Sequence, residues 1–410
     1  MALCAESSSD PGIALPSRAF TFTGIAQLVG WNAVLTASAF LDSEIFPGRK
    51  WAFRTAIIYA VGTTIGQAVM IGGPLPRLPF SVRWCLSVVC MMSAMLGLFA
   101  MVALTQNGAL AVDVGFDVAL SCVILLSLGA AVFQASTFGL AGAADPALSG
   151  RLMMGQGIAG IVTGVASVFK PSLTVLGCLV GVTVLTSLLA LVVYCAQLRV
   201  HPQIRSILER MAADRLLPSA DAVSMQGSLG GGAMPQLASP RRRNRRIAQD
   251  VLSQAIGVFF IFLVTFVVFP GVVTRWSGAL GLPATRFVTL MVGEFQLLDV
   301  AGRTAAGYVR APRGKVVLAS SLSRAAFVPL FIGAQIGGEN SFFSNGVWEV
   351  VLMGLFAFSN GFVSTLGMML GPERVCFKEE KETAGHIMSF SLASGILVGS
   401  LLALLTQVRF

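Results

Sequence analysis

Charged residues are scarce in this chain, and their scarcity points to its class. Asp, Glu, Lys and Arg make up 11% of the 410 residues, whereas hydrophobic residues make up 55%. A soluble globular protein carries charge at about a quarter of its positions. The mean hydropathy of +0.80 is correspondingly high. This composition excludes a soluble domain and indicates a polytopic membrane protein.

Several kinds of chemistry lack the residues that they need. Only two histidines occur, His201 and His386, which argues against a His-based catalytic triad or metal centre. The seven cysteines form no CxxC pair, so neither a zinc site nor a disulfide framework is predicted. The phosphate loop GxxxxGK(S/T) is absent, which argues against an ATP-driven pump. We therefore expect no enzyme, no cofactor and no metal.

Long apolar runs are what the chain has in abundance. Eleven stretches follow one another, each with about the 20 residues that cross a hydrocarbon core as a helix. A lipid-facing strand would instead alternate apolar and polar residues. We predict an all-α polytopic membrane protein with eleven transmembrane helices, near 20–41, 54–73, 84–105, 116–140, 152–169, 173–196, 250–269, 286–309, 315–335, 347–370 and 386–408.

The longest break between the apolar runs, residues 197–249, divides them into six and five. It contains GSLGGGAMPQLASP followed by RRRNRR, a composition that cannot bury enough apolar surface to fold alone. We predict a cytoplasmic tail at 1–19, an N-terminal bundle at 20–196, a cytoplasmic linker at 197–249 and a C-terminal bundle at 250–410. Two bundles joined in this way suggest a transporter with its substrate site at their interface.

The basic residues predict the orientation. With a cytoplasmic N-terminus, most of the 28 Lys and Arg residues fall on the cytoplasmic side, as the positive-inside rule requires. An odd number of spans then places the C-terminus outside the cell, and we expect the protein in the plasma membrane. The RRRNRR cluster needs no nucleic acid, because anionic lipid attracts each Lys or Arg by about 1 kcal/mol. The lipid bilayer is the expected partner, and a monomer is the expected state.

The stretch FQLLDVAGR, residues 295–303, places an acid and a base inside the eighth apolar run. Asp299 and Arg303 lie four positions apart, so they share a helix face and can pair, and Gln296 points the same way. Ionisable groups within a span face a bundle interior or a water-filled cavity. We expect this face to line a cavity and bind a polar solute. The alternative is that Arg303 extends to the membrane surface with Asp299 as its counter-ion.

Motifs in nearly every apolar run resemble those of the equilibrative nucleoside transporter family. FQLLDVAGR resembles the signature of its eighth helix, GWNAVLTASAFL its first helix, with Gly30 where proline is common, and FQASTFGLAG its fourth. GQGIAG, VVFPG and SRAAFVPL fit its fifth, seventh and ninth helices, and AFSNGFVSTLGMMLGPERV followed by ETAGHIM is similar to its tenth and eleventh. The resemblance implies nucleoside transport by alternating access, in a fold that resembles the major facilitator architecture.

The resemblance also implies substrate-site roles for Trp31, Leu35, Gln134, Asp299 and Arg303, and Gln296, on the same helix face, completes the predicted site. The tryptophan and the leucine would form apolar walls against a purine. The first glutamine would bind the edge of the base, and the acid with the arginine would bind the ribose hydroxyls. The second glutamine stands where the family commonly has asparagine, and its longer amide leaves less room. Purine nucleosides are the expected substrates, with nucleobases as a second class.

A purely structural role stays open at several of these positions. Trp31 could be part of the packed core, and Leu35 enters the site through the resemblance alone. A glutamine within a span often bonds another helix, which would give Gln134 a structural role. The glycines of GQGIAG are expected to let helices approach one another closely, a structural role as well.

Four more residues are predicted to form gates or structural contacts: Asn32, Phe269, Arg324 and Asn360. The asparagine of the first run is expected to bond a neighbouring helix. The phenylalanine, at the outer end of the seventh run, is an outer-gate candidate. The arginine is a second buried cation, expected to pair with an acid or a helix end near the cytoplasmic gate, Glu294 being one candidate. The asparagine of the tenth run is expected to hydrogen-bond across the bundle.

Three functions are compatible with these residues. A uniporter driven by the nucleoside gradient is favoured, because the Arg303 cation favours a permanently charged Asp299. The alternative is a proton-coupled nucleoside or nucleobase symporter, in which Asp299 gains and loses a proton. The third is a receptor that does not transport, or an intramembrane enzyme. An enzyme would need a nucleophile and a base within reach of one another, and apart from Asp299 the spans offer no convincing base.

Overall fold

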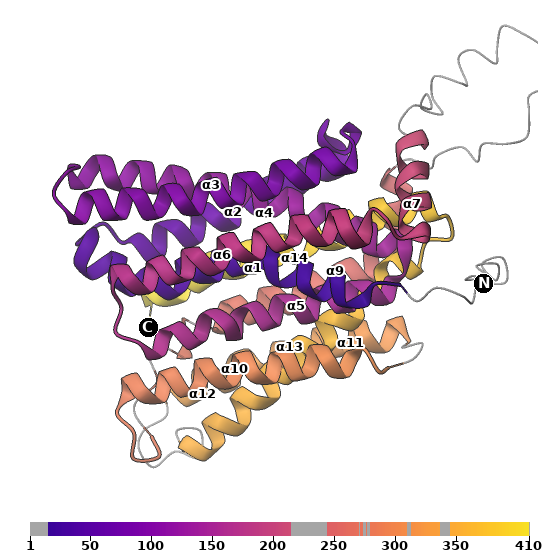
Figure 1. Ribbon diagram of the computed structural model, residues 1–410. Helices are drawn as coiled ribbons and strands as arrows, with labels where there is room; N and C mark the ends of the chain where they lie inside the picture. The colour runs from indigo at the N-terminus through magenta and orange to yellow at the C-terminus, as the bar shows by residue number, and fades with distance from the viewer. Residues whose placement is uncertain are drawn as a thin grey trace, which may run out of the picture.

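The computed structural model describes residues 15–214, 244–269, 271–273, 276, 279–309, 313–336 and 345–409. The regular elements in these ranges are helices, and the long ones run side by side (Figure 1). The long helices are α1 (Ser17–Phe40), α2 (Trp51–Gly72), α3 (Phe80–Gln106), α4 (Val112–Ala144), α5 (Pro146–Gly164), α6 (Leu173–Val193), α9 (Asn244–Val268), α10 (Ala284–Ala306), α13 (Gly346–Glu373) and α14 (Lys378–Arg409). The shorter ones are α7 (Pro202–Asp214), α11 (Gly314–Ser323) and α12 (Phe327–Ile336).

Each predicted apolar run coincides with a helix, α11 and α12 together covering the run at 315–335. In the described residues, nine helices or joined helices are long and apolar enough to cross a membrane. The two predicted spans outside this set are α5 and α10. Glycines and polar residues dilute the apolar character of α5, and α10 carries Glu294, Asp299 and Arg303. The count of eleven spans and its division into six and five stay predictions.

The ninth predicted span is interrupted by a 3₁₀ turn, Arg324–Ala326, between α11 and α12. Pro329 lies in the first turn of α12. Proline has no N–H to donate to the carbonyl four residues earlier, and its ring crowds that carbonyl. The chain therefore tightens at Arg324–Ala326 instead of continuing as regular α-helix.

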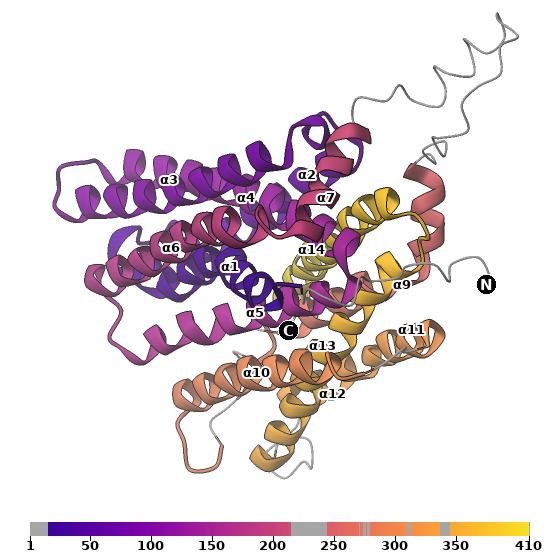
Figure 2. The same ribbon diagram turned by 45° about the vertical axis from the view of Figure 1, so that its right-hand side comes forward.

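The two parts of the chain pack against each other along one long contact. We call α1–α6 the first half, α9–α14 the second half, and the contact between them the seam. In Figure 2 α5 of the first half, in magenta, lies beside α10 and α13 of the second half, in orange. α14 packs against α2 and α4 as well as against α9. Helix α14 therefore belongs to the second half by sequence but contacts both.

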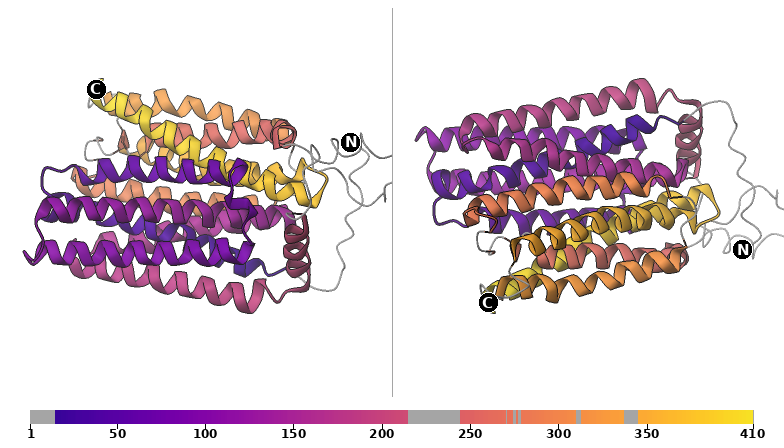
Figure 3. Two further views of the ribbon diagram at one scale, coloured as in Figure 1. Left: turned by 90° about the horizontal axis from the view of Figure 1, so that it is seen from above. Right: turned by 90° about the horizontal axis from the view of Figure 1, so that it is seen from below.

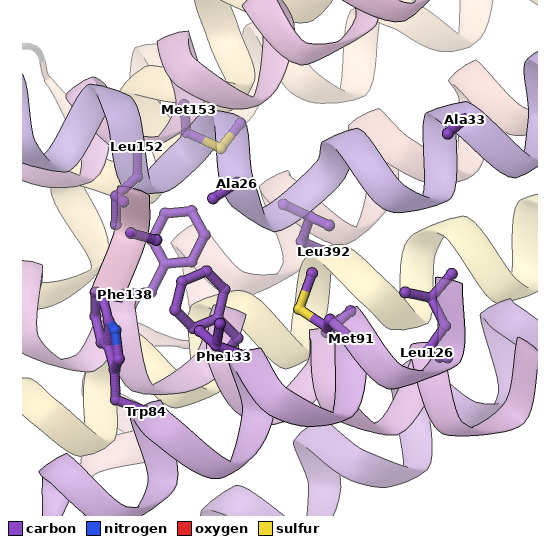
Figure 4. Close-up of a cluster of buried hydrophobic side chains, with 14 of the residues drawn as sticks. Ala26, Ala33, Trp84, Met91, Leu126, Phe133, Phe138, Leu152, Met153 and Leu392 are labelled. Carbon is purple, nitrogen blue, oxygen red and sulfur yellow. The ribbon is translucent and has the colours of Figure 1, made fainter. Parts of the chain in front are cut away.

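The largest hydrophobic core crosses the seam. Leu392 and Met388 of α14 belong to the same buried cluster as Phe133 of α4 and Trp84 of α3. Figure 4 shows side chains of this cluster from α1, α3, α4, α5 and α14 packed together. Because burial of apolar area stabilises each contact, the two halves are held together by packing as well as by polar contacts.

Helices α1 and α5 approach closely because of glycine. A β-carbon built on Gly155 of α5 would lie 1.9 Å from the backbone carbonyl of Thr21 in α1. A side chain at this position would therefore push the two backbones apart, and the short spacing requires a residue without one. This agrees with the structural role predicted for the glycines of GQGIAG.

Helix α7 stands crosswise at one end of the long helices (Figure 3). Its buried face consists of Ile204, Ile207 and Met211, whereas Arg205 and Arg210 are exposed. The buried face packs against α4 and α14, which come from different halves. We call this end of the molecule, where α1, α3, α9 and α14 begin, the linker end, and the opposite end the far end.

The outer surface of the long helices is apolar. On α3, Leu86, Val89 and Leu96 are about half exposed, at 52%, 52% and 50%. A soluble protein rarely exposes an apolar surface that continues over several turns of one helix. The surface instead suits lipid, and the chain is a multi-pass integral membrane protein.

The cysteines in the described residues include five free thiols, at positions 85, 90, 122, 178 and 195. Each of them lies on a different turn or a different helix, as their spacing in the sequence predicted. Cys376, between α13 and α14, is disulfide-bonded. A single bonded cysteine is not a disulfide framework, so the prediction is not contradicted.

Candidate functional site

The acid and the base of α10 form the predicted ion pair. Nε of Arg303 donates to Oδ2 of Asp299 over 2.6 Å. Asp299 is 3% exposed and Arg303 is 8% exposed. The pair therefore faces the protein interior, and Arg303 does not extend to the membrane surface. An ionised pair in this setting is stable only where its remaining polar groups also find partners.

Arg303 also bonds a helix on the other side of the seam. Its Nη1 donates to the backbone carbonyl of Met153 in α5 over 2.8 Å. The side chain can approach α5 because Gly157 lies beside it, and a β-carbon built there would be 3.1 Å from Cδ of Arg303. A single guanidinium thus joins a carboxylate of the second half to a helix backbone of the first half.

The other oxygen of the carboxylate is held within the second half. Oδ1 of Asp299 accepts from Nδ2 of Asn360 in α13 over 2.8 Å. Oδ1 of Asn360 in turn accepts from the hydroxyl of Thr265 in α9 over 2.7 Å. Asn360 therefore makes the hydrogen bonds between helices that the sequence predicted. Each oxygen of Asp299 thus accepts a hydrogen bond from the protein, Oδ2 from Arg303 and Oδ1 from Asn360.

The second buried cation continues the same network. Nη2 of Arg324 donates to the Thr265 hydroxyl over 3.1 Å, and Nη1 donates to the carbonyl of Phe356 over 2.9 Å and to the hydroxyl of Ser359. Its guanidinium also lies 4.7 Å from the centre of the Phe356 ring, close enough for a cation–π interaction. Arg324 thus uses a carbonyl, two hydroxyls and a ring where an acid was expected.

Glu294 packs against α13. The carboxylate lies against Gly354 of α13, where an added β-carbon would be 3.0 Å from Oε1 of Glu294. The hydrogen-bond partners of Arg324 lie on α9 and α13. In the described residues no ion pair joins Glu294 to Arg324, so Glu294 is not the counter-ion that the sequence offered.

Gln296 faces α5. A β-carbon built on Gly160 of α5 would lie 2.2 Å from Oε1 of Gln296. Gln296 and Arg303 therefore present their side chains to the same helix of the first half. Asp299, which the sequence placed in the same direction, turns toward α13 instead. Helix α10 thus divides its polar residues between the seam and the interior of the second half.

Trp31 of α1 lies against a residue that the sequence analysis did not single out. Its ring stacks on Tyr59 of α2 with 3.9 Å between the ring centres and 8° between the planes. Leu35, one turn further along α1, is 44% exposed. Asn32 is half-buried beside Trp31. The only sequence signal for Tyr59 is an aromatic hydroxyl inside the second apolar run, which does not reveal its partner.

Gln134 of α4 forms an amide pair with a second residue that was not predicted. Nε2 of Gln67 in α2 donates to Oε1 of Gln134 over 3.0 Å. The backbone carbonyl of Gln134 accepts from the Thr137 hydroxyl, which accepts from Gln27 of α1. Gln134 therefore bonds another helix, the structural role left open for it. An amide within an apolar run is a sequence signal that could have identified Gln67.

Phe269 follows α9 at the far end. Its ring stacks on Phe295 of α10 with 4.3 Å between the centres and 13° between the planes. Phe295 in turn packs against Phe356 at 6.1 Å. Phe269 thus belongs to an aromatic cluster of the second half, and its role as an outer gate stays a prediction.

A second ion pair closes the seam at the linker end. Nη2 of Arg83 in α3 lies 2.9 Å from Oε1 of Glu382 in α14, and Arg83 is fully buried. Beside it, a β-carbon built on Gly385 of α14 would lie 2.4 Å from the carbonyl of Phe138 in α4. Helices α3 and α4 therefore contact α14 directly at this end.

The structure brings the candidate residues together in two groups. In the second half, Asp299 and Arg303 form one network with Asn360 and Arg324. In the first half, Trp31 contacts Tyr59 of α2, and Gln134 contacts Gln67 of α2. The seam lies between the two groups and is crossed by Arg303.

Solved structures with a similar fold are membrane transporters. A bacterial homologue of the iron transporter ferroportin in its outward-facing state has a TM-score of 0.63 and 15% identity, covering 96% of this chain and 93% of its own. A proton:xylose symporter of the major facilitator superfamily has a TM-score of 0.58 and 11% identity, covering 96% of this chain and 94% of its own. The fold resembles that of the major facilitator superfamily.

The sequence narrows this class to one family. The profile described as Nucleoside transporter matches residues 120–408, and the chain belongs to the nucleoside transporter family. Equilibrative nucleoside transporter 1 of Rattus norvegicus is 27% identical over 98% of this chain and 86% of its own length. The protein of that name from Homo sapiens is 27% identical over 94% of this chain and 95% of its own. The resemblance drawn from the motifs is confirmed.

A shorter similarity points to a further relative. Adenosine transporter 1 of Crithidia fasciculata is 30% identical over 156 residues, which is 36% of this chain and 30% of that protein. This match covers part of the chain only, whereas the rat and human relatives extend over nearly all of it. Family membership therefore rests on the long matches and on the family profile.

Proposed function

We propose that this protein carries nucleosides across a membrane, down their concentration gradient, by alternating access at the seam. Membership of the nucleoside transporter family supports the substrate class, and a relative named as an adenosine transporter supports purine nucleosides as the first choice. The observation that carries the mechanism is the guanidinium of Arg303, which holds Asp299 with one nitrogen and the Met153 carbonyl across the seam with another.

Ribose hydroxyls are suited to exchange with the donors around Asp299. A hydroxyl donates to a carboxylate as the Asn360 amide does, so exchange keeps the number of hydrogen bonds to Asp299 constant. If Arg303 turned to the same sugar, it would release the Met153 carbonyl. Substrate binding would then weaken a contact between the halves, and a gain in binding energy in one conformation over the other is what shifts such an equilibrium.

The base would bind in the first half. Tyr59 covers one face of the Trp31 ring, and a purine would stack on the other face. Leu35, which is 44% exposed, would add an apolar wall one turn away. Gln134 would hydrogen-bond the edge of the base, and Gln296 would limit the space beside the sugar. The nucleoside would thus bridge the seam, with its base toward α1 and α4 and its ribose toward α10.

The conformation described here would be the one that is closed at the linker end. The ion pair of Arg83 with Glu382, together with the contact between Gly385 and Phe138, would block passage there. The positive-inside rule assigns that end to the cytoplasm. We propose a monomer in the plasma membrane with a cytoplasmic N-terminus, an extracellular C-terminus and eleven spans arranged as six and five.

Uptake by the purified full-length protein in sealed proteoliposomes tests this function. Labelled adenosine, inosine and uridine should enter until inside and outside concentrations are equal, and unlabelled nucleoside inside should accelerate exchange. An imposed pH gradient should leave the initial rate unchanged. Strong acceleration by a proton gradient directed inward would overturn the uncoupled mechanism. Nucleoside binding without uptake or exchange would overturn transport altogether.

A further inference from the structure

The amide pair of Gln67 and Gln134 is incompletely bonded. Gln67 is fully buried and Gln134 is 7% exposed. They share one hydrogen bond, from Nε2 of Gln67 to Oε1 of Gln134. Oε1 of Gln67 and Nε2 of Gln134 are buried without a hydrogen-bond partner among the described residues. Buried amide groups are nearly always paired, so an acceptor and a donor left open side by side require an explanation.

The two amides are held against each other by the packing of their helices. A β-carbon built on Gly66, next to Gln67, would lie 2.6 Å from Cβ of Ala131 in α4. Ala131 is one turn before Gln134 on the same helix. Because α2 and α4 are this close, the two glutamine side chains extend from neighbouring backbones. The packing of the two helices therefore supports their shared hydrogen bond.

The amide pair lies near the seam and shares α2 with the aromatic pair. Gln134 and Phe138 are four residues apart on α4 and share a face, and the Phe138 carbonyl meets Gly385 of α14 across the seam. On α2, Tyr59 and Gln67 are eight residues apart, which is about 12 Å along the axis of a helix. Tyr59 stacks on Trp31. A flat solute stacked near Trp31 would thus extend along α2 toward the two amides.

We propose that Gln67 is a positioning residue that determines which end of the Gln134 amide is offered to the substrate base. This inference rests on the proposed nucleoside transport. Because Gln67 donates to Oε1 of Gln134, the polar group of the Gln134 side chain that remains without a partner is its NH₂. Gln134 is thereby a donor toward the base and not an acceptor.

The fixed donor selects among purines. Guanine presents two acceptors, N7 and O6, on one edge, and hypoxanthine, the base of inosine, has the same two atoms there. Adenine presents N7 beside an amino group. Because that amino group is itself a donor, it cannot accept from the second N–H of Gln134. Gln67 therefore favours 6-oxopurine nucleosides, inosine and guanosine, over adenosine. Without Gln67 the Gln134 amide can turn over, present its carbonyl to the adenine amino group, and lose the preference.

Initial uptake rates of labelled inosine and adenosine, measured in proteoliposomes of the full chain, test this proposal. The wild-type protein should take up inosine in preference to adenosine at equal concentration. Gln67→Met keeps the length of the side chain and removes both polar groups, and it should lower the inosine-to-adenosine ratio of kcat/KM at least fivefold. In a Gln134→Met background the same substitution should leave the ratio unchanged, because no amide remains to be oriented.

A matched control is available in the same half. Gln27 is 2% exposed and also bonds a buried glutamine, since its Oε1 accepts from Gln156 over 2.8 Å. Gln27→Met should change the total uptake and the melting temperature without changing the inosine-to-adenosine ratio. A purely structural role for Gln67 would make both substitutions behave in this way.

The outcomes are distinguishable. An inosine-to-adenosine ratio that stays within twofold of wild type in Gln67→Met, or a wild-type preference for adenosine, overturns the role of Gln67 but leaves nucleoside transport intact. No uptake of either nucleoside by the wild-type protein overturns the proposed function itself. If Gln67→Met is not recovered as a folded protein, Gln67→Leu is subject to the same criteria, with nucleoside-dependent thermal stabilisation in detergent as the second readout.

Discussion

Arg303 donates to Asp299 over 2.6 Å and closes an ion pair within one turn of α10. The same guanidinium donates to the Met153 carbonyl of α5. The pair is therefore a local feature of one helix and a link between two distant parts of the chain at the same time. Its removal should affect both the charge balance of the second half and the strength of the seam.

We expect Asp299→Asn and Arg303→Ala each to reduce nucleoside uptake at least tenfold. Each substitution removes one partner of a buried ion pair, and the charge left behind is destabilising by about 3–5 kcal/mol. Uptake is measured in proteoliposomes at matched protein content. Because part of the loss could come from unfolding, the melting temperature and the amount of protein in the membrane are measured alongside. Wild-type uptake in either variant would mean that the pair has no part in transport.

The effects of substituting Arg83 and Glu382 on protein stability should be coupled. Arg83 has no exposed surface, so Glu382→Gln leaves a buried cation with weaker compensation and should lower the melting temperature. The double variant Arg83→Gln with Glu382→Gln removes both charges and should be less destabilised than the sum of the single variants. Additive effects in this double-mutant cycle would show that the two side chains do not interact.

We expect the ion pair of Arg83 and Glu382 to control how often the seam opens at the linker end. A cysteine introduced at Gly139, which lies beside Glu382, would be the obvious probe, but its side chain would collide there. Cys90 and Cys122 are native thiols away from that contact and serve as the internal reference. We expect Glu382→Gln to increase the labelling of a cysteine placed at Ala135, one turn before Gly139 on α4, by a membrane-permeant maleimide. Unchanged labelling would argue against Glu382 as part of a gate.

Glycine substitutions on α10 should differ sharply between two positions. A β-carbon on Gly302 would lie 2.2 Å from the backbone carbonyl of Phe358 in α13, whereas one on Gly293 would meet no atom of the described residues within 4 Å. Gly302→Ala should therefore abolish uptake or folding, because a backbone cannot move aside as a side chain can. Gly293→Ala should be neutral or stabilising by about 1 kcal/mol through helix propensity. Similar melting temperatures for the two variants would contradict this packing.

Replacement of Trp31 should weaken the affinity for the nucleoside. We expect Trp31→Ala to raise the KM for adenosine at least fivefold, because the base loses an aromatic surface, and Trp31→Phe to retain most of the affinity. Trp51 provides the control, since it is fully buried against Phe46 and Phe116 in another cluster. Trp51→Phe should alter the yield of folded protein but not the KM. Equal KM values for wild type and Trp31→Ala would remove Trp31 from the substrate site.

Local spacing accounts for what could be predicted. An apolar run of sufficient length forms a helix because the backbone must satisfy its own hydrogen bonds in lipid, and every predicted run coincides with a helix. Asp299 and Arg303 pair because residues four apart share a helix face. Arg324 shows the limit of the same logic, since its spacing marked a buried cation but its partners, among them the Phe356 carbonyl, lie on helices that spacing cannot identify.

The sequence alone determined that this chain is a membrane protein of apolar helices, which transporter family it resembles, and that one turn of one helix holds an acid and a base. The tertiary structure decided the contacts between helices: Asn360 with Asp299, Gln67 with Gln134, and Arg83 with Glu382. These partners are far apart in the sequence, and periodicity within a helix says which residues share a face but not which other helix that face meets. That choice follows from how all the helices pack together, where glycines permit close approach and a buried polar group must find its partner.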